Sequence, residues 1–151
     1  MKPVRVFSRN APPAIGPYSQ AILLGGLIFV SGQLGLDPES GQLASPQIEP
    51  QTRRALENLK AILEEAGSGL ESVLKTTIFL TDMANFQVMN GIYAEYFRIH
   101  PPARTTVCVK ELPKQAIIEV EAIAFTRNGH SLNSSLERSS ALMPQIQSLK
   151  E

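Results

Sequence analysis

Apolar residues recur along this chain with two spacings, one typical of strands and one typical of helices. In AIIEVEAIAF (116–125) every second position is apolar, which is the two-residue period of a strand with one buried face. The buried face of this strand would carry Ile118, Val120, Ala122 and Ala124, and the opposite face Ile117, Glu119, Glu121 and Ile123. The strand therefore presents two carboxylates on the face that does not enter the core.

Helical spacing appears twice. Between residues 51 and 66 the apolar positions recur every three or four residues, with Pro50 near the start and Gly67 just past the end. A second helix is predicted after Asp82, with one apolar stripe formed by Phe86, Met89, Tyr93 and Phe97. The pattern thus predicts two amphipathic helices.

The remaining apolar runs read as short strands. VRVF (4–7) is followed by a proline-rich connection that resists helix and central strand, and SVLKTTIFL (72–80) is rich in β-branched residues. QAILL and LIFVSG are joined by Gly25 and Gly26, a strong signal for a two-residue hairpin turn. TTVCVKEL (105–112) and AIIEVEAIAF are separated by LPKQ, which predicts a second hairpin.

Paired strands with two helices between them predict an α+β fold, a two-layer sandwich with both helices on one face of the sheet. We expect one domain over residues 1–128, because 151 residues are enough for a single core. Residues 129–151 are serine-rich, and we expect a loose tail or a short helix there.

Composition narrows the class of protein. Fourteen basic residues balance fourteen acidic ones, so the chain has no general attraction for nucleic acid or anionic membranes. No apolar run approaches the roughly 18 residues that cross a bilayer. A single cysteine fits a reducing compartment, and we expect the cytoplasm, although the first 36 residues carry Lys2, Arg5 and Arg9 without an acid, a bias also found in organellar presequences.

The second predicted hairpin suggests a candidate site. If it turns at about Pro113 and Lys114, then Arg104, Thr106 and Cys108 stand opposite Ile123, Glu121 and Glu119 with the same side-chain parity. A cation and two carboxylates would then share one side of the sheet. The alternatives are a solvated outer face for the glutamates and a lone surface arginine.

Such a cluster has a definite chemistry. A guanidinium binds a carboxylate through two parallel hydrogen bonds, and a nearby glutamate can deprotonate a water that attacks the adjacent carbon. Neither step requires a metal or a cofactor. Cys108 has no histidine near it in the chain and is expected to be a packing residue, and His100 and His130 lack partners at metal-ligand spacing.

The ordered motifs IGPYSQA, VSGQLGLDPESG, NLKAILEEAG, VLKTTIFLTDMANFQVMN, PPART and LPKQAIIEVEAIA resemble the RidA/YjgF family of enamine/imine deaminases over about residues 4–126. The resemblance implies a fold like chorismate mutase of the bacillus type, with a mixed sheet, and a homotrimer with clefts between subunits. It also implies hydrolysis of 2-aminoacrylate and 2-aminocrotonate, through 2-iminopropanoate and 2-iminobutanoate, to 2-keto acids and ammonia. Removing these reactive intermediates protects other enzymes.

The resemblance also assigns residues. It implies that Arg104 in PPAR binds the substrate carboxylate and that Glu119, the first acid of IEVE, activates the water, whereas Glu121 matches a structural position. The other expected substrate-binding residues are Tyr18, Ser31, Gly32, Asn90 and Thr106. Thr106 occupies the place where the family often has a cysteine, which puts any thiol-dependent regulation in doubt.

Two other functions stay open. A trimer of this fold could bind a small carboxylate for regulation without turnover, since a fold does not fix a reaction. RNA cleavage has been attached to relatives, but the neutral charge and the lack of paired histidine or lysine acids and bases speak against it here.

Overall fold

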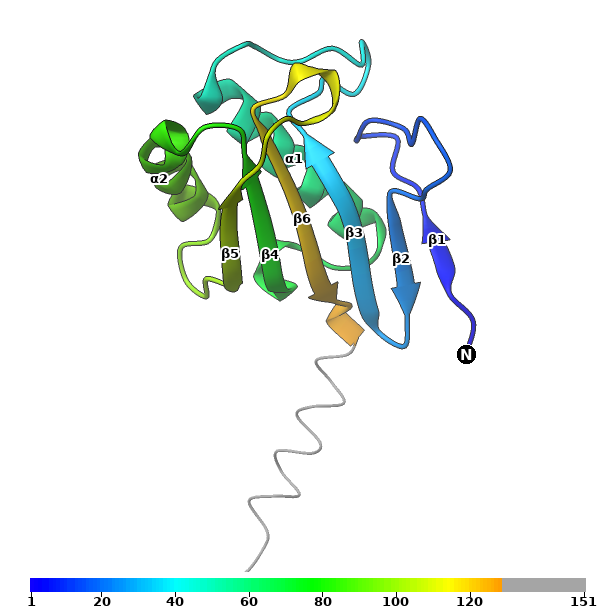
Figure 1. The fold of residues 1–151 in the computed structure, drawn as a ribbon. Coiled ribbons are helices and arrows are strands. Elements are labelled where there is room, and N and C mark those ends of the chain that lie inside the picture. Colours follow the sequence, from blue (N-terminus) through cyan, green and yellow to red (C-terminus); the bar gives the residue numbers. More distant parts are fainter. Residues whose placement is uncertain (129–151) are drawn as a thin grey trace, which may run out of the picture.

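A mixed sheet of six strands organises residues 1–128, the part of the chain that this computed structural model describes (Figure 1). The strands are β1 (Val4–Val6), β2 (Ala21–Leu24), β3 (Leu27–Leu34), β4 (Val73–Leu80), β5 (Ala103–Cys108) and β6 (Ile118–Phe125). They lie in the order β1-β2-β3-β6-β4-β5, and only β4 and β5 are parallel to each other. The predicted serine-rich tail, residues 129–151, lies outside the described residues.

The two predicted helices are present and cover one face of the sheet. They are α1 (Ile48–Glu65), which begins three residues earlier than predicted and has Pro50 in its first turn, and α2 (Phe86–Tyr96). Three short 3-10 turns accompany them, η1 (Leu70–Ser72), η2 (Met83–Asn85) and η3 (Pro113–Gln115). Within residues 1–128, neither helix is long and apolar enough to cross a membrane.

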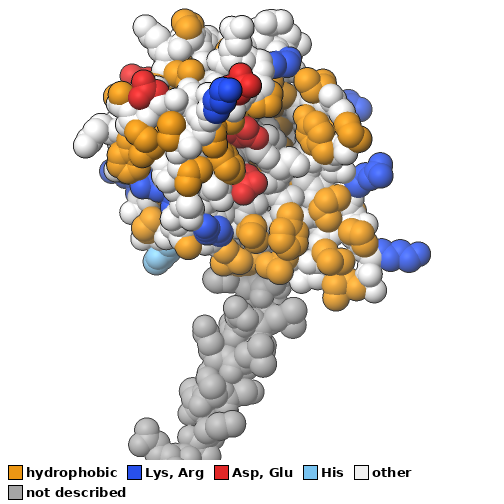
Figure 2. All heavy atoms as spheres, in the orientation of Figure 1, with side chains coloured by type: hydrophobic (Ala, Val, Ile, Leu, Met, Phe, Trp, Pro, Cys, Tyr) orange, Lys and Arg blue, Asp and Glu red, His pale blue; other side chains and the backbone are white. Residues whose placement is uncertain are grey.

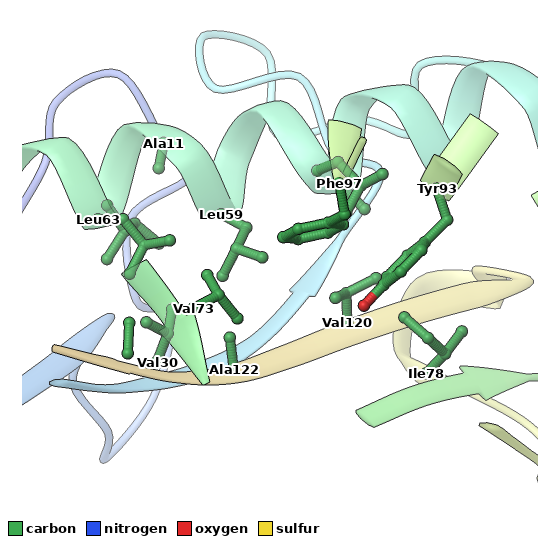
Figure 3. Packing of buried hydrophobic residues seen from close by; sticks show 14 of the residues in the cluster. Ala11, Val30, Leu59, Leu63, Val73, Ile78, Tyr93, Phe97, Val120 and Ala122 are labelled. Carbon is green, nitrogen blue, oxygen red and sulfur yellow. The ribbon is translucent and has the colours of Figure 1, made fainter. Parts of the chain in front are cut away.

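The core lies between the helices and the sheet. Leu59 and Leu63 of α1 point toward the sheet, where Val30 and Ala122 lie, and Tyr93 of α2 points toward the same layer (Figure 3). The predicted apolar face of β6 is buried throughout, since Ile118, Val120, Ala122 and Ala124 are at most 3% exposed. An α+β fold with two helices on one face is therefore confirmed.

The first predicted hairpin is confirmed. β2 and β3 pair antiparallel through Leu24 and Leu27, and the two residues between them, Gly25 and Gly26, have φ angles of 58° and 84°. Two successive positive φ values suit glycine and match the right-handed twist of the flanking strands.

The second predicted hairpin is wrong. β6 is inserted between β3 and β4, whereas β5 pairs parallel to β4 at the far edge of the sheet. The physical reason is the crossover: α2 lies between β4 and β5 in the chain, and a strand, a helix and a strand in that order favour parallel pairing. With both edges of β6 occupied, β5 has no place beside it.

Candidate active site

Glu119 lies on the face of the sheet that the helices leave open. It pairs with Phe79 of β4 and Leu34 of β3, and its side chain is half-buried. Burial raises the pKa of the Glu119 carboxyl above its ordinary value, and the neighbouring Glu121 carboxylate adds to the effect. Figure 2 shows acidic side chains near the middle of this face, over β6. The raised pKa makes Glu119 a stronger base than an ordinary surface glutamate.

A bulge in β3 makes room for the Glu119 carboxyl. The pairing between β3 and β6 shifts register between Val30 and Gln33, which leaves Ser31 and Gly32 outside the ladder. A Cβ atom built on Gly32 would overlap the Glu119 carboxyl, so only glycine lets the carboxyl lie against the backbone here. The bulge and the glycine together position the acid.

Ser31 connects this bulge to the segment that carries Tyr18. Its amide donates to the Gln20 carbonyl at 3.0 Å, and its Oγ donates to the Ser19 carbonyl at 2.6 Å. The Tyr18 hydroxyl accepts from the Ile15 amide at 3.4 Å and keeps its own proton for another acceptor. Tyr18, Ser31, Gly32 and Glu119 all line one pocket of about 500 Å³.

The pocket walls come from distant parts of the chain. Buried Gln20 fastens the proline-rich segment: its Oε1 accepts from the Ser8 amide at 2.7 Å, and its Nε2 donates to the Pro12 carbonyl at 2.8 Å. The Lys114 ammonium in η3 donates to the Gly41 carbonyl at 3.0 Å and closes the opposite wall. Neither Gln20 nor the side chain of Lys114 stands out in the sequence, because Gln20 looks like any polar residue and LPKQ is typical of a turn.

The start of β6 is tied to α1. Gln51, which is fully buried, donates from Nε2 to the Ser45 carbonyl at 2.8 Å and accepts at Oε1 from the Ile117 amide at 3.0 Å. Ile117 precedes Glu119 by two residues. The hydrogen bond to the Gln51 side chain therefore fixes the start of the strand that carries Glu119.

Arg104 lies on the opposite face of the sheet from Glu119. It pairs with Thr76 of β4, whose side chain is buried toward the helices and whose Oγ1 lies 2.7 Å from the Tyr93 hydroxyl. The Arg104 guanidinium lies 4.7 Å from the centroid of the Tyr93 ring and 5.7 Å from that of Phe86. Within residues 1–128 it forms no ion pair, so its planar fork is available to another carboxylate.

Asn90 and Thr106 belong to the same side. Asn90 is exposed on α2, one helical turn from both Phe86 and Tyr93, and Thr106 shares its face of β5 with Arg104. The Thr106 hydroxyl is buried and has no hydrogen-bond partner among residues 1–128. Cys108 is exposed, so its expected packing role is wrong: β5 is an edge strand and leaves the thiol in solvent.

The predicted residues therefore form two groups rather than one cluster. The carboxylate half-site consists of Tyr18, Ser31, Gly32 and Glu119, and the guanidinium half-site consists of Asn90, Arg104 and Thr106. The predicted register that set Arg104 and Thr106 opposite Ile123 and Glu121 is wrong, since β4 separates β5 from β6. Within one chain the two half-sites lie on opposite faces of the sheet.

The described residues were searched for side chains that could together bind a metal ion. Residues 1–128 contain no group of three or more histidine, cysteine, aspartate or glutamate side chains that could hold a metal ion. The residues that line the pocket carry a carboxylate, hydroxyls, side-chain amides and an ammonium group.

Comparison with known proteins gives a consistent result. The family model described as endoribonuclease L-PSP matches residues 8–126. A RutC family protein of Pyrococcus abyssi is 52% identical over 120 residues, which cover 80% of this chain and 94% of the relative. The human 2-iminobutanoate/2-iminopropanoate deaminase is 45% identical over 120 residues, which cover 80% of this chain and 88% of that protein.

Solved structures agree in fold. The structure of the YjgF gene product of Escherichia coli superposes with a TM-score of 0.78 at 41% identity, covering 82% of this chain and 99% of that one. The structure of Escherichia coli TdcF with bound serine gives a TM-score of 0.77 at 38% identity, covering 81% and 98%.

Proposed function

This chain belongs to the family described as endoribonuclease L-PSP, which includes RidA-type proteins, and we propose that it is a deaminase that hydrolyses 2-imino acids to 2-keto acids and ammonia. The proposed substrates are 2-iminopropanoate and 2-iminobutanoate, reached from the enamines 2-aminoacrylate and 2-aminocrotonate by tautomerisation. The observation that carries the proposal is a half-buried Glu119 of raised pKa in a pocket, together with Arg104, which forms no ion pair within residues 1–128.

The proposed active site lies between two copies of the chain. Glu119 and Arg104 lie on opposite faces, so one chain cannot direct both at the same small substrate. The face that the helices leave open exposes apolar side chains, among them Phe29 at 44% and Leu27 at 40%, and Figure 2 shows hydrophobic side chains gathered over the lower ends of β2 and β3. Exposed apolar surface of this kind favours association, and we propose a homotrimer in which each Glu119 faces the Arg104 of a neighbour.

The reaction follows from these groups. Arg104 holds the substrate carboxylate through two charged hydrogen bonds, which places the imine carbon in the neighbour's pocket. Ionised Glu119 takes a proton from water as the water oxygen bonds to that carbon, and it passes this proton to the imine nitrogen, which gives a neutral carbinolamine. Glu119, ionised again, takes the hydroxyl proton of the carbinolamine and passes it to the nitrogen as the carbon–nitrogen bond breaks, so that the products are a 2-keto acid and ammonia.

The physiological setting is part of the proposal. Reactive enamines arise from dehydratases that act on serine and threonine, and their removal protects other enzymes from damage. The single cysteine suits the reducing cytoplasm, which is where we place this activity. Neither proposed step requires a cofactor.

A coupled assay tests the proposed reaction. A threonine dehydratase generates 2-aminocrotonate, and the decay of the enamine and imine is followed with wild-type protein and with Arg104→Ala. We expect wild-type protein to accelerate the decay and Arg104→Ala to lose at least about 100-fold in kcat/KM, because two charged hydrogen bonds are removed. If the decay proceeds at the same rate with both proteins, the result favours the alternative, a regulatory trimer that binds small carboxylates without turnover. A sedimentation mass of three chains is expected in the same preparation.

A further inference from the structure

Lys114 is a second charged residue in the pocket that holds Glu119. Fourteen residues line this pocket, and Glu119 and Lys114 are the only charged ones among them. The other residues that line the pocket are apolar or uncharged; Pro12, Ile15 and Leu36 are examples. The pocket in one chain therefore contains one anion and one cation, and the reaction proposed above uses only the anion.

The Lys114 ammonium is held in place rather than free. Its Nζ donates to the Gly41 carbonyl at 3.0 Å, which joins η3 to the turn after β3; these two loops lie close together above the sheet in Figure 1. A lysine ammonium has three donor hydrogens, and this bond uses one. No carboxylate among residues 1–128 forms an ion pair with it. Two donors and the full charge remain available to a ligand.

The backbone around Lys114 adopts a conformation that non-glycine residues seldom take. Lys114 has a φ angle of 55° and Gln115 one of 59°, two successive left-handed residues with side chains. Backbone strain of this kind persists only where the surroundings enforce it, and it concentrates at ligand sites. In this conformation the Lys114 side chain reaches the Gly41 carbonyl and lines the pocket.

The pocket is larger than the proposed small substrates require. Its volume of about 500 Å³ falls in the range of about 300 to 1,000 Å³ that holds drug-sized ligands, whereas three- and four-carbon imino acids would fill only a fraction of it. A longer substrate side chain has space here, and the fixed ammonium supplies a partner for an anionic end.

We infer that Lys114 is a specificity-determining residue that binds a distal carboxylate, so that the pocket accepts 2-imino dicarboxylates such as 2-iminoglutarate. The inference rests on the proposed deaminase function and extends its substrate class. In this arrangement Arg104 of the neighbour binds the carboxylate next to the imine, and Lys114 binds the carboxylate at the other end of the substrate. A charge-assisted hydrogen bond of this kind distinguishes a charged side chain from an apolar one of similar length.

The test compares two imines of similar length, both made in place by amino-acid oxidases in the presence of catalase. One is derived from glutamate and carries a distal carboxylate, and the other is derived from methionine and is neutral. The readout is kcat/KM for the glutamate-derived imine divided by kcat/KM for the methionine-derived imine. A general disturbance of the η3 loop would lower both values and leave this ratio unchanged. The variants are Lys114→Met, Lys114→Arg and, as a matched control, Lys110→Met, which removes an exposed charge from the same loop outside the pocket.

We expect Lys114→Met to lower the ratio about tenfold, and Lys114→Arg and Lys110→Met to leave it within about twofold of wild type. A ratio unchanged in Lys114→Met, or lowered equally by Lys110→Met, overturns the inference. Turnover of 2-iminobutanoate is measured alongside. If the wild-type protein hydrolyses 2-iminobutanoate but the ratio does not respond to Lys114, only this inference fails; if it hydrolyses none of the three imines, the proposed function fails as well.

Discussion

The carboxylate half-site and the guanidinium half-site are built in different ways. Glu119 lies on an inner strand, in a pocket whose walls come from the N-terminal segment, the β3 bulge and η3. Arg104 lies on the edge strand β5, on the opposite face, and rests on two rings of α2. In the proposed reaction, one chain supplies the water-activating half and a neighbouring chain supplies the carboxylate-binding half. The placement of the two half-sites on opposite faces is the reason that we propose a pair of chains as the unit of function.

The largest expected effect comes from removing the base. Glu119→Gln keeps the shape of the side chain but cannot accept the proton of water, so we expect kcat to fall roughly 10²- to 10⁴-fold. Glu121→Gln is the control on the same face: it leaves the base in place and removes a charge that raises the pKa of Glu119. Its kcat is expected within about threefold of wild type, with the acid limb of the pH profile at lower pH. Equal losses in both variants would show that Glu119 has no special role.

Gly32 tests how the carboxylate half-site is positioned. In Gly32→Ala the added methyl group displaces the Glu119 carboxyl, and we expect a loss of about 100-fold in kcat/KM, since a displacement of about 1 Å is enough for that. Gly91→Ala is the matched control, because nothing lies within 4 Å of its added methyl group. It is expected to keep full activity. An active Gly32→Ala protein would contradict the close approach of Glu119 to the β3 bulge.

Arg104→Lys tests the guanidinium half-site. Lysine keeps the charge but offers neither the two parallel donors nor a planar group for the Tyr93 ring, so kcat/KM is expected to fall about 10- to 100-fold. Arg98→Lys, at an exposed arginine after α2, is expected to change nothing. Steady-state kinetics on 2-iminobutanoate measures both. Full activity in Arg104→Lys would mean that a point charge suffices.

The smallest effect concerns stability. The pKa of Glu119 is raised in the folded chain, so its ionised form costs stability at neutral pH, and Glu119→Gln removes this cost. We expect the inactive variant to melt higher than wild type at pH 7, by on the order of a few °C at most. The difference should shrink as the pH falls through the raised pKa and vanish below the ordinary value of 4.5, where both side chains are neutral. Melting curves of the wild-type and Glu119→Gln proteins at pH 4 and pH 7 measure this difference in melting temperature.

The sequence predicted the parts of this site better than their arrangement. The alternation in β6 identified Glu119 on the open face, and the glycine pair identified the β2–β3 hairpin, because both signals are local. The pairing of β5 was missed, since it depends on β6 occupying the edge of β4, a contact between segments far apart in the chain. The hydrogen bonds of the buried Gln20 and Gln51 side chains could not be predicted either, because in a sequence a glutamine with buried partners looks like any other polar residue.

The central claim is that each active site takes Glu119 from one chain and Arg104 from another. The direct measurement mixes Arg104→Ala and Glu119→Gln proteins, each inactive alone, by unfolding and refolding them together in equal amounts, with each variant refolded separately as the control. With random assembly, one site in about four joins an intact Arg104 to an intact Glu119, so activity should return to about a quarter of the refolded wild type. A mixture of assembled chains that stays as inactive as its parents would contradict the account.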